Sequence, residues 1–186
     1  PELLLKEPPD QPMKTYDLIV VGGGPAGFFG ALRFAELCPK ASVLILEKGD
    51  TLLQKVLISG GGRCNISHDC NDPNELIKAY PRGGKALRNA FYQFGLAQLI
   101  KWFETRGLKF YIDTEGCYFP VTDKAQSVVH VLLDGATRLG IQLRTGAGVQ
   151  SIQRKESSLY YKLGLSDGAE VSAPLVLIAS GGNRQM

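Results

Sequence analysis

A glycine-rich turn between two short apolar runs constrains this chain more than any other feature. The first run covers residues 16–21, and G-G-G-P-A-G at residues 22–27 then fits the pattern G-x-G-x-x-G. A helical pattern extends to about Leu37, and a second apolar run at residues 42–46 leads to Glu47. Strand, glycine turn, helix and second strand in this order are typical of a dinucleotide-binding βαβ unit.

Each glycine of this turn has its own physical role in such a unit. Gly22 allows the tight turn off the strand, Gly24 lets a pyrophosphate approach the backbone, and Gly27 lets the helix pack closely on the strand. The free N–H groups and the positive dipole end of the helix would face the phosphates. Glu47 would accept hydrogen bonds from ribose hydroxyls, which favours FAD or NAD over NADP. The alternative is a glycine turn without a ligand.

Composition narrows the class of protein. The chain has 186 residues, of which 44% are hydrophobic and 21% charged, as expected for one globular domain. Its net charge is +3, and Lys and Arg are scattered among acidic residues along most of the chain, so no nucleic-acid partner is expected. No apolar run reaches the roughly 20 residues that span a bilayer, and no signal-peptide pattern is present, so no membrane partner is expected.

Cysteines and histidines give little support for a metal site or a disulfide framework. The chain has four cysteines and two histidines, and no metal-ligand spacing occurs among them. The cysteines form no C-x-x-C pair, which favours reduced thiols in a cytoplasmic protein. The cysteines are Cys38, Cys64, Cys70 and Cys117.

Two further glycine turns follow the first. Residues 59–65 read S-G-G-G-R-C-N, so backbone N–H groups could face an anion while Arg63 adds a fixed charge. The alternative is a flexible turn with a solvated Arg63, although two glycine loops around one βαβ unit favour binding. The third turn, residues 180–182, follows an apolar run at 175–179 that predicts a buried parallel strand. The carboxyl ends of such strands are where open α/β sheets bind ligands.

The remaining patterns predict an α/β protein. Helices are expected from Pro73 with Asp72 as the cap, and over residues 85–94, 96–106 and 124–139. Strands are expected over 108–112, 141–144, 149–153, 159–165 and 170–171, the last three alternating like antiparallel strands. The fold class is a Rossmann-like FAD/NAD(P)-binding domain, with a parallel sheet plus a small antiparallel β-meander. Residues 1–12, with four prolines, predict an extension or linker before a domain at residues 13–186.

The chain resembles a family of flavoproteins related to aminoacetone oxidase and 3-dehydro-bile-acid reductase. Four features carry the resemblance: residues 16–27 with Glu47, S-G-G-G-R-C-N at 59–65, Phe119-Pro120, and A-S-G-G at 179–182. The second of these is the specific signature. The family belongs to the glutathione-reductase-like group of NAD(P)/FAD-dependent oxidoreductases, and the resemblance runs from about Lys14 to Asn183.

The resemblance implies FAD as the cofactor, with either NAD(P)H as a co-substrate or an organic molecule as the electron donor, and the sequence contains no second complete NAD(P) motif. The resemblance also implies a role for each motif position. The implied FAD-binding residues are Gly22, Gly24, Pro25, Ala26 and Gly27 at the pyrophosphate, Glu47 and Lys48 at the adenosine, Ser59, Gly60, Gly61, Gly62, Arg63, Cys64 and Asn65 along the pyrophosphate, ribityl chain and flavin, Val149 at the adenine, and Ala179, Ser180, Gly181 and Gly182 closing over the cofactor.

Two departures from the family limit what can be carried over. His68 stands where the signature usually has Asn, and family members are considerably longer than this chain. The chain therefore corresponds to an N-terminal portion, truncated relative to the family. Alone it is expected to bind FAD weakly or not at all, to show no turnover, and to self-associate or need a partner chain that completes its sheet.

The catalytic residues are not defined by the sequence. Cys64 and Cys70 invite comparison with a redox disulfide, but their spacing of five intervening residues differs from the usual four, and Cys64 is better explained by packing. His68 is a candidate proton donor, with a surface role as the alternative. Two hypotheses remain: the FAD-binding part of an oxidoreductase acting on an unidentified small organic substrate, or a non-catalytic nucleotide-binding or interaction module.

Overall fold

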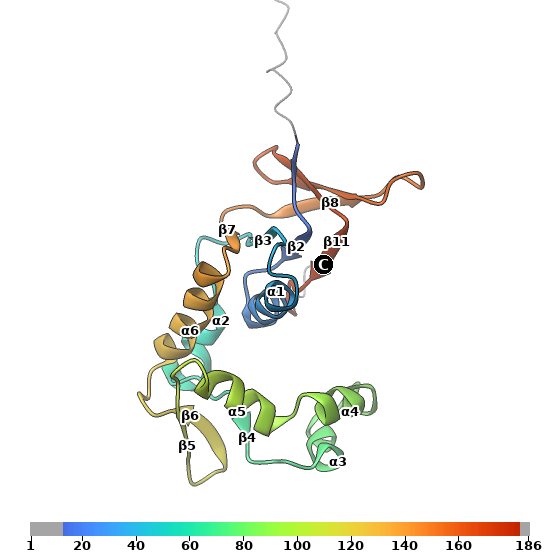
Figure 1. Cartoon of the computed structure of the whole chain (residues 1–186). Helices are drawn as coiled ribbons and strands as arrows, with labels where there is room; N and C mark the ends of the chain where they lie inside the picture. Colours follow the sequence, from blue (N-terminus) through green and yellow to red (C-terminus); the bar gives the residue numbers. More distant parts are fainter. Residues whose placement is uncertain (1–12, 183–186) are drawn as a thin grey trace, which may run out of the picture. The chain divides into compact units, whose positions relative to one another are not determined.

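The computed structural model describes residues 13–182, which divide into two compact units (Figure 1). The first unit contains residues 13–51 and 140–182, and the second contains Leu52–Leu139. The extension or linker predicted at residues 1–12 lies outside the described residues. The second unit is therefore inserted in sequence between two strands of the first, a division that the sequence patterns did not predict.

A four-stranded parallel sheet forms the centre of the first unit. Its order is β11-β2-β3-β7, with β2 at Leu18–Val21, β3 at Val43–Leu46, β7 at Gln142–Arg144 and β11 at Leu175–Ile178. The residues of β3 are all buried, as expected for a strand covered on both faces. Helix α1 (Pro25–Leu37) connects β2 to β3 and buries Phe28 and Leu32 against them. The predicted βαβ unit and the Rossmann-like fold class are thus confirmed.

Strand β11 is parallel, as predicted, but the expectation that it is buried was wrong. The side chains of Leu175 and Ile178 are 50% and 58% exposed. The physical reason is position, because within residues 13–182 β11 pairs with β2 on one side only and is an edge strand of the sheet. A run of Leu, Val and Ile predicts an extended conformation, but it does not say which strands lie beside it.

The predicted antiparallel meander covers one face of the parallel sheet. It consists of β8 (Val149–Gln153), β9 (Tyr161–Leu165) and β10 (Glu170–Ala173), and a short strand β1 (Lys14–Thr15) joins β10 in parallel. Strand β1 was not predicted, since two residues carry no periodicity. A buried cluster that includes Ile19, Leu44 and Leu163 joins the meander to the parallel sheet. This contact holds the start of β8 beside the carboxyl ends of β2 and β3.

The second unit combines short helices with a small sheet. Its elements are α2 (Gln54–Ile58), η1 (Ser59–Gly62), β4 (Ser67–His68), α3 (Pro73–Leu76), η2 (Ile77–Ala79), α4 (Gly84–Gln93), α5 (Leu96–Glu104), β5 (Phe110–Ile112), β6 (Cys117–Pro120) and α6 (Ala125–Arg138). The helices predicted around residues 73, 85, 96 and 124 are confirmed. The strand predicted over 108–112 is present as β5. Helix α2, strand β4 and the pairing of the sheet β4-β6-β5 were not predicted, because these elements are too short to show a clear period.

Aromatic packing helps to form the core of the second unit. The ring of Phe103 meets the ring of Trp102 edge-on at 4.9 Å and the ring of Phe110 at 5.5 Å, measured between centroids. Phe103 is buried, so these contacts fix α5 against β5. None of the helices within residues 13–182 is long and apolar enough to cross a membrane.

Candidate functional site

The first glycine turn brings three stretches of backbone into direct contact. Gly22 has a φ of +117°, and a Cβ on it would lie 2.3 Å from the carbonyl oxygen of Ala179. A Cβ on Gly27 would lie 2.0 Å from the carbonyl oxygen of Gly22. Any side chain at either position would collide with backbone, which cannot move without shifting a strand. These two glycines therefore hold α1 and the end of β11 against the end of β2.

Gly24 is different, because the space beside it is open. It is the N-cap of α1, with φ −86° and ψ 179°, and no atom lies within 4 Å of a Cβ built on it. No side chain caps the helix, its first turn contains no acidic residue, and Pro25 follows at the start. The first N–H groups of α1 and the positive end of its dipole thus face open space that suits a phosphate group.

Glu47 follows β3 and is held by the backbone of two turns. Its Oε2 accepts a hydrogen bond from the Gly23 N–H at 2.8 Å, and its Oε1 accepts one from the Gly49 N–H at 2.9 Å. An ionised carboxylate accepts about four hydrogen bonds, so lone pairs remain for a ligand. The two bonds fix the direction of the carboxylate beside the first glycine turn. The residue is therefore preorganised to accept bonds from a pair of hydroxyls.

A cavity of about 410 Å³ opens at the carboxyl ends of β2, β3 and β11. It brings together five of the predicted cofactor residues, namely Gly22, Glu47, Lys48, Val149 and Ser180. Other lining residues were missed by the sequence reasoning: Ala147, Gly148, Gln150, Ser151 and Ile152. Only Val149 was proposed from this segment, because an exposed, alternating strand carries no signal for ligand binding. A cavity of this volume is large enough for one nucleotide half of a dinucleotide.

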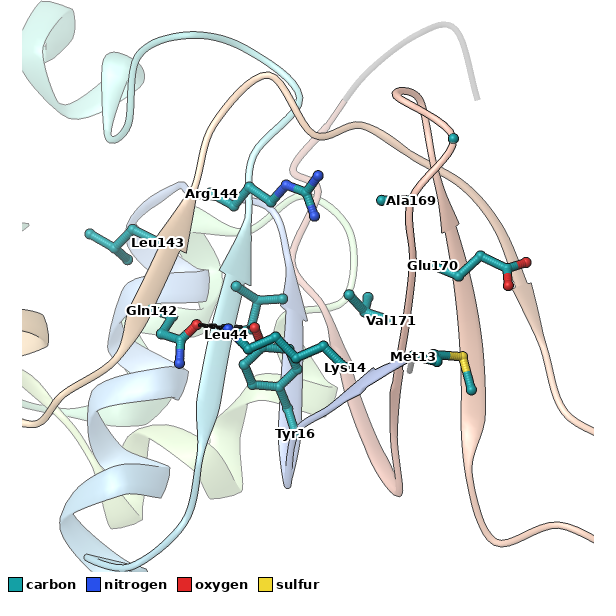
Figure 2. A pocket seen from close by; sticks show the side chains of 11 residues that line it. Met13, Lys14, Tyr16, Leu44, Gln142, Leu143, Arg144, Ala169, Glu170 and Val171 are labelled. Atoms are coloured by element: carbon teal, nitrogen blue, oxygen red, sulfur yellow. Dashed lines mark hydrogen bonds between the residues drawn. The ribbon is translucent and has the colours of Figure 1, made fainter. Parts of the chain in front are cut away.

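A larger cavity of about 600 Å³ lies elsewhere in the first unit and contains none of the predicted residues (Figure 2). Its polar groups bond to the protein itself. Gln142 Oε1 accepts hydrogen bonds from Lys14 Nζ at 2.9 Å and from the Tyr16 hydroxyl at 3.0 Å. Arg144 pairs with Asp167. These bonds tie β7 to β1 and to the β9–β10 turn, so the cavity is explained by structure rather than by a ligand.

The second glycine loop has an unusual backbone and lies in the second unit. Gly60, Gly61 and Gly62 have φ values of 54°, 67° and 88°, and η1 covers Ser59–Gly62. The guanidinium of Arg63 stacks over the ring of Phe119 at 4.0 Å from its centroid. Arg63 is therefore not simply solvated. Cofactor binding by residues 59–65 stays a prediction.

Cys64 and His68 have contrasting environments in the second unit. Cys64 is buried, with a φ of +64°, while His68 is exposed in β4. Burial raises the pKa of the Cys64 thiol, and a hydrogen bond with Ser59 opposes that shift to a smaller extent. A buried thiol with a raised pKa is less nucleophilic at neutral pH, which supports packing over redox catalysis for Cys64. The role of His68 as a proton donor stays a prediction.

We expect Cys64 to react with iodoacetamide more slowly than Cys38 at neutral pH. The thiolate is the reacting form, and the raised pKa and burial of Cys64 both lower its availability, whereas Cys38 is exposed. Mass spectrometry of peptides after a timed reaction measures both rates, and reaction in denaturant provides the control. Equal rates in the folded chain would contradict the environment described for Cys64.

Three potential metal ligands approach one another within the second unit, but a turn explains them. Donor atoms of Asp113, Glu115 and Cys117 lie within 4.8 Å of one another. Asp113 Oδ1 accepts hydrogen bonds from the N–H groups of Glu115 and Cys117, both at 2.9 Å. The carboxylate of Asp113 thus closes the turn between β5 and β6, which is a common role for Asp.

Comparison with known families shows to which protein family the chain belongs. The HI0933-like protein Rossmann domain matches residues 16–185, almost the whole chain. The chain belongs to the HI0933-like family. This confirms the family resemblance drawn from S-G-G-G-R-C-N and the accompanying motifs. The Rossmann-type domain of this HI0933-like chain is of the kind that FAD-dependent oxidoreductases use to bind their cofactor.

Two relatives match this HI0933-like chain over most of its length. The 3-dehydro-bile acid delta(4,6)-reductase of Clostridium scindens is 29% identical over 163 residues, which cover 88% of this chain and 38% of the relative. The ribosomal RNA dihydrouridine synthase of Escherichia coli is 28% identical over 170 residues, which cover 91% of this chain and 40% of the relative. The chain thus spans about two fifths of the length of these relatives.

Solved structures of other proteins share the fold. A flavocytochrome c3 fumarate reductase aligns with a TM-score of 0.67 at 18% identity, covering 91% of this chain and 34% of the other. The 3-ketosteroid-delta4-(5alpha)-dehydrogenase of Rhodococcus jostii RHA1 aligns with a TM-score of 0.64 at 16% identity, covering 94% and 47%. At these identities the similarity shows the fold alone.

Proposed function

We propose that this chain is the FAD-binding part of a flavin-dependent oxidoreductase that reduces an unsaturated organic substrate, with NAD(P)H as the electron donor. The observation that carries the proposal is the site in the first unit. Gly24 leaves open space at the N-terminus of α1, and Glu47 lies beside it with its carboxylate fixed by two backbone N–H groups. Together they suit the pyrophosphate and ribose of an adenine dinucleotide.

The residues present fit the adenosine half of FAD. The N–H groups of α1 would hold the pyrophosphate, and Glu47 would orient the ribose. Val149 and its neighbours would exclude water from the adenine side of the 410 Å³ cavity. FAD, when bound, would supply hydride transfer between a donor and the substrate. Ser59–Asn65 and the turn at residues 179–182 are proposed to contact the rest of the cofactor.

The names of the two relatives support the type of reaction. A delta(4,6)-reductase and a dihydrouridine synthase are both named for adding hydrogen to an unsaturated ring. Their substrates belong to different chemical classes, a steroid and an RNA nucleoside, so the shared element is the reduction. We propose this reaction for the protein to which the chain belongs, in the cytoplasm, and propose that completion of the sheet beside β11 is needed for turnover.

The cofactor prediction can be tested directly. The chain is expected to bind FAD but not FMN, because FMN lacks the adenosine monophosphate that the first unit would recognise. Flavin fluorescence titration measures both affinities, and ADP should compete with FAD. A full-length protein that binds neither FAD nor ADP would contradict the proposal. Because turnover is expected only when the sheet is complete, reduction by NADH or NADPH is measured on the full-length protein, where FAD binding without reduction would favour the non-catalytic alternative.

A further inference from the structure

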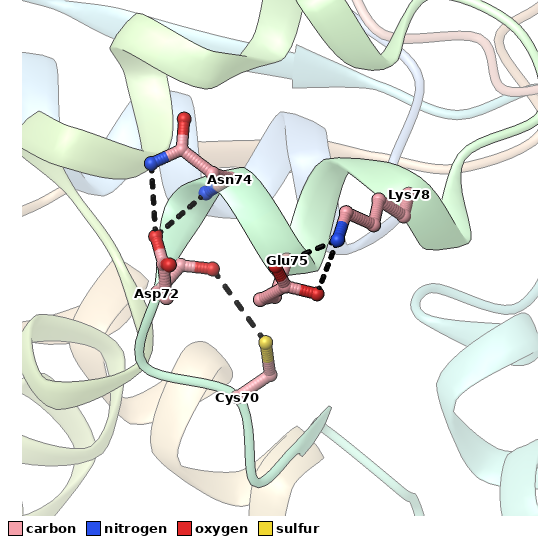
Figure 3. A network of polar contacts seen from close by, with 5 residues as sticks. All are labelled: Cys70, Asp72, Asn74, Glu75 and Lys78. Carbon is pink, nitrogen blue, oxygen red and sulfur yellow. Dashed lines mark hydrogen bonds and ion pairs between the residues drawn. The ribbon is translucent and has the colours of Figure 1, made fainter.

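Arg63 in the second glycine loop is charged but has no acidic partner among the described residues. Lys78, in the same unit, shows the usual arrangement, because both carboxylate oxygens of Glu75 lie 2.6 Å from its Nζ (Figure 3). Within residues 13–182, Arg63 makes no such ion pair. The loop also has open space two residues earlier, since no atom lies within 4 Å of a Cβ built on Gly61. The guanidinium is therefore free to pair with a negatively charged ligand.

The ring of Phe119 supports this guanidinium from one side. Arg63 Cζ lies 4.0 Å from the ring centroid, in a cation–π contact. Phe119 is only 3% exposed, so its ring is fixed by the core of the second unit. The backbone of the same loop passes close to this ring, because a Cβ on Gly60 would lie 3.0 Å from Phe119 Cε1. The ring thus holds the loop and its charged side chain together.

The hydroxyl of Tyr111 connects Arg63 to a carboxylate without forming an ion pair. This hydroxyl donates a hydrogen bond to Asp123 Oδ1 at 2.8 Å. The bond to Asp123 is the main cause that raises the pKa of Tyr111, and a hydrogen bond from Arg63 opposes the shift. The phenol oxygen therefore accepts from Arg63 while its proton points to Asp123. A direct ion pair would also fix the guanidinium, but it would neutralise the charge that a ligand needs.

Asp123 is held in an uncommon backbone conformation. Its φ is +54°, in the left-handed region that residues other than glycine rarely adopt. Its N–H donates to the carbonyl oxygen of Pro120 at 2.8 Å, which closes a tight turn directly after β6. The turn presents the carboxylate to Tyr111 of the neighbouring strand β5. One short segment, residues 119–123, thus supplies both the ring and the carboxylate that act on Arg63.

We propose that Tyr111 and Asp123 are positioning residues, which fix the guanidinium of Arg63 in the direction that binds the pyrophosphate of FAD. The proposal rests on the proposed contact of residues 59–65 with this cofactor. A guanidinium that is already fixed loses little conformational freedom when it binds, and its planar fork matches phosphate oxygens. Tyr111 and Asp123 act through Arg63 and need no contact with the ligand.

Trypsin measures how firmly Arg63 is held, because cleavage after Arg63 requires its side chain to leave Phe119 and enter the protease. In the 186-residue chain without cofactor, Tyr111→Phe should speed this cleavage at least about threefold, since one hydrogen bond to the guanidinium is lost. Mass spectrometry of timed digests identifies the site and measures the rate. Cleavage after Lys101, in α5 of the same unit, reports general unfolding and should stay the same.

Tyr118→Phe is the matched control for Tyr111→Phe. Tyr118 lies in the same small sheet, and its hydroxyl also bonds a carboxylate, Asp69 Oδ1 at 3.5 Å. Its loss should leave cleavage after Arg63 unchanged. Equal rates of this cleavage in the two tyrosine variants would overturn the proposal. A bond that only stabilises the second unit would instead speed cleavage after Lys101 as well, and that result would also overturn it.

Titration of the full-length protein with FAD and with ADP tests whether the position of Arg63 affects binding. Both ligands contain the diphosphate, so Tyr111→Phe should lower both affinities by the same factor, at least about threefold, and Tyr118→Phe should change neither. Arg63→Lys keeps the charge but loses the planar fork, and it should lower both affinities at least as much.

An unchanged ADP affinity in Tyr111→Phe, or full FAD affinity in Arg63→Lys, would overturn the proposal. A full-length protein that binds neither FAD nor ADP would contradict the proposed function instead. The cleavage rates need no cofactor, so they would still decide whether Tyr111 holds Arg63.

Discussion

Gly24→Val is expected to leave the chain folded while lowering its affinity for FAD at least about tenfold, or about 1.4 kcal/mol. The backbone of Gly24 is extended, with φ −86° and ψ 179°, so valine can adopt it, and no protein atom lies within 4 Å of the added Cβ. The two methyl groups would occupy the space through which a pyrophosphate must approach the N-terminus of α1. The cost therefore appears in binding and not in folding.

Flavin titration measures the affinity, and urea unfolding measures the stability of the same samples. Gly24→Ala should give a smaller loss, because one methyl group blocks less space. Ala97→Val is a suitable control, since it places valine at an exposed first-turn position of α5. An FAD affinity of Gly24→Val equal to that of the unchanged chain would mean that the phosphate does not bind at this turn.

Gly27→Ala should act on folding rather than on FAD binding. We expect it to lower the free energy of unfolding by about 3 kcal/mol or more. In an ordinary exposed helix this substitution stabilises by about 1 kcal/mol, because alanine is the better helix former. At Gly27 the new Cβ would lie 2.0 Å from the Gly22 carbonyl oxygen and 3.2 Å from Val20 Cγ1. Relief requires α1 to move away from β2, which opens the buried contact of Phe28.

Gly30→Ala, one turn further along α1, is the matched control. A Cβ there would meet Leu177 Cδ2 at 2.5 Å, but this atom is the end of a flexible side chain that can rotate away. Urea unfolding should therefore place Gly30→Ala close to the unchanged chain and Gly27→Ala far below it. Equal stability of the two variants would mean that the packing of α1 on β2 is looser than the backbone contacts indicate.

The βαβ unit could be predicted from the sequence because its determinants are local. Strand, turn and helix follow one another within residues 16–47, and each is defined by its own periodicity or by glycine spacing. Gly24 and Glu47 were identified for the same reason, since their distance from the turn along the chain fixes their place in the unit. The antiparallel meander was also predictable, because its strands alternate clearly between polar and apolar residues.

The tertiary structure decided which segments lie beside these local elements. Residues 147–152 line the candidate site because the meander packs on the parallel sheet, and nothing in their own pattern indicates a ligand. Strand β11 is exposed because it is an edge strand of the sheet formed by residues 13–182, although its composition is that of a buried strand. Burial of Cys64 likewise depends on how the chain packs around it, and such packing leaves no period in the sequence.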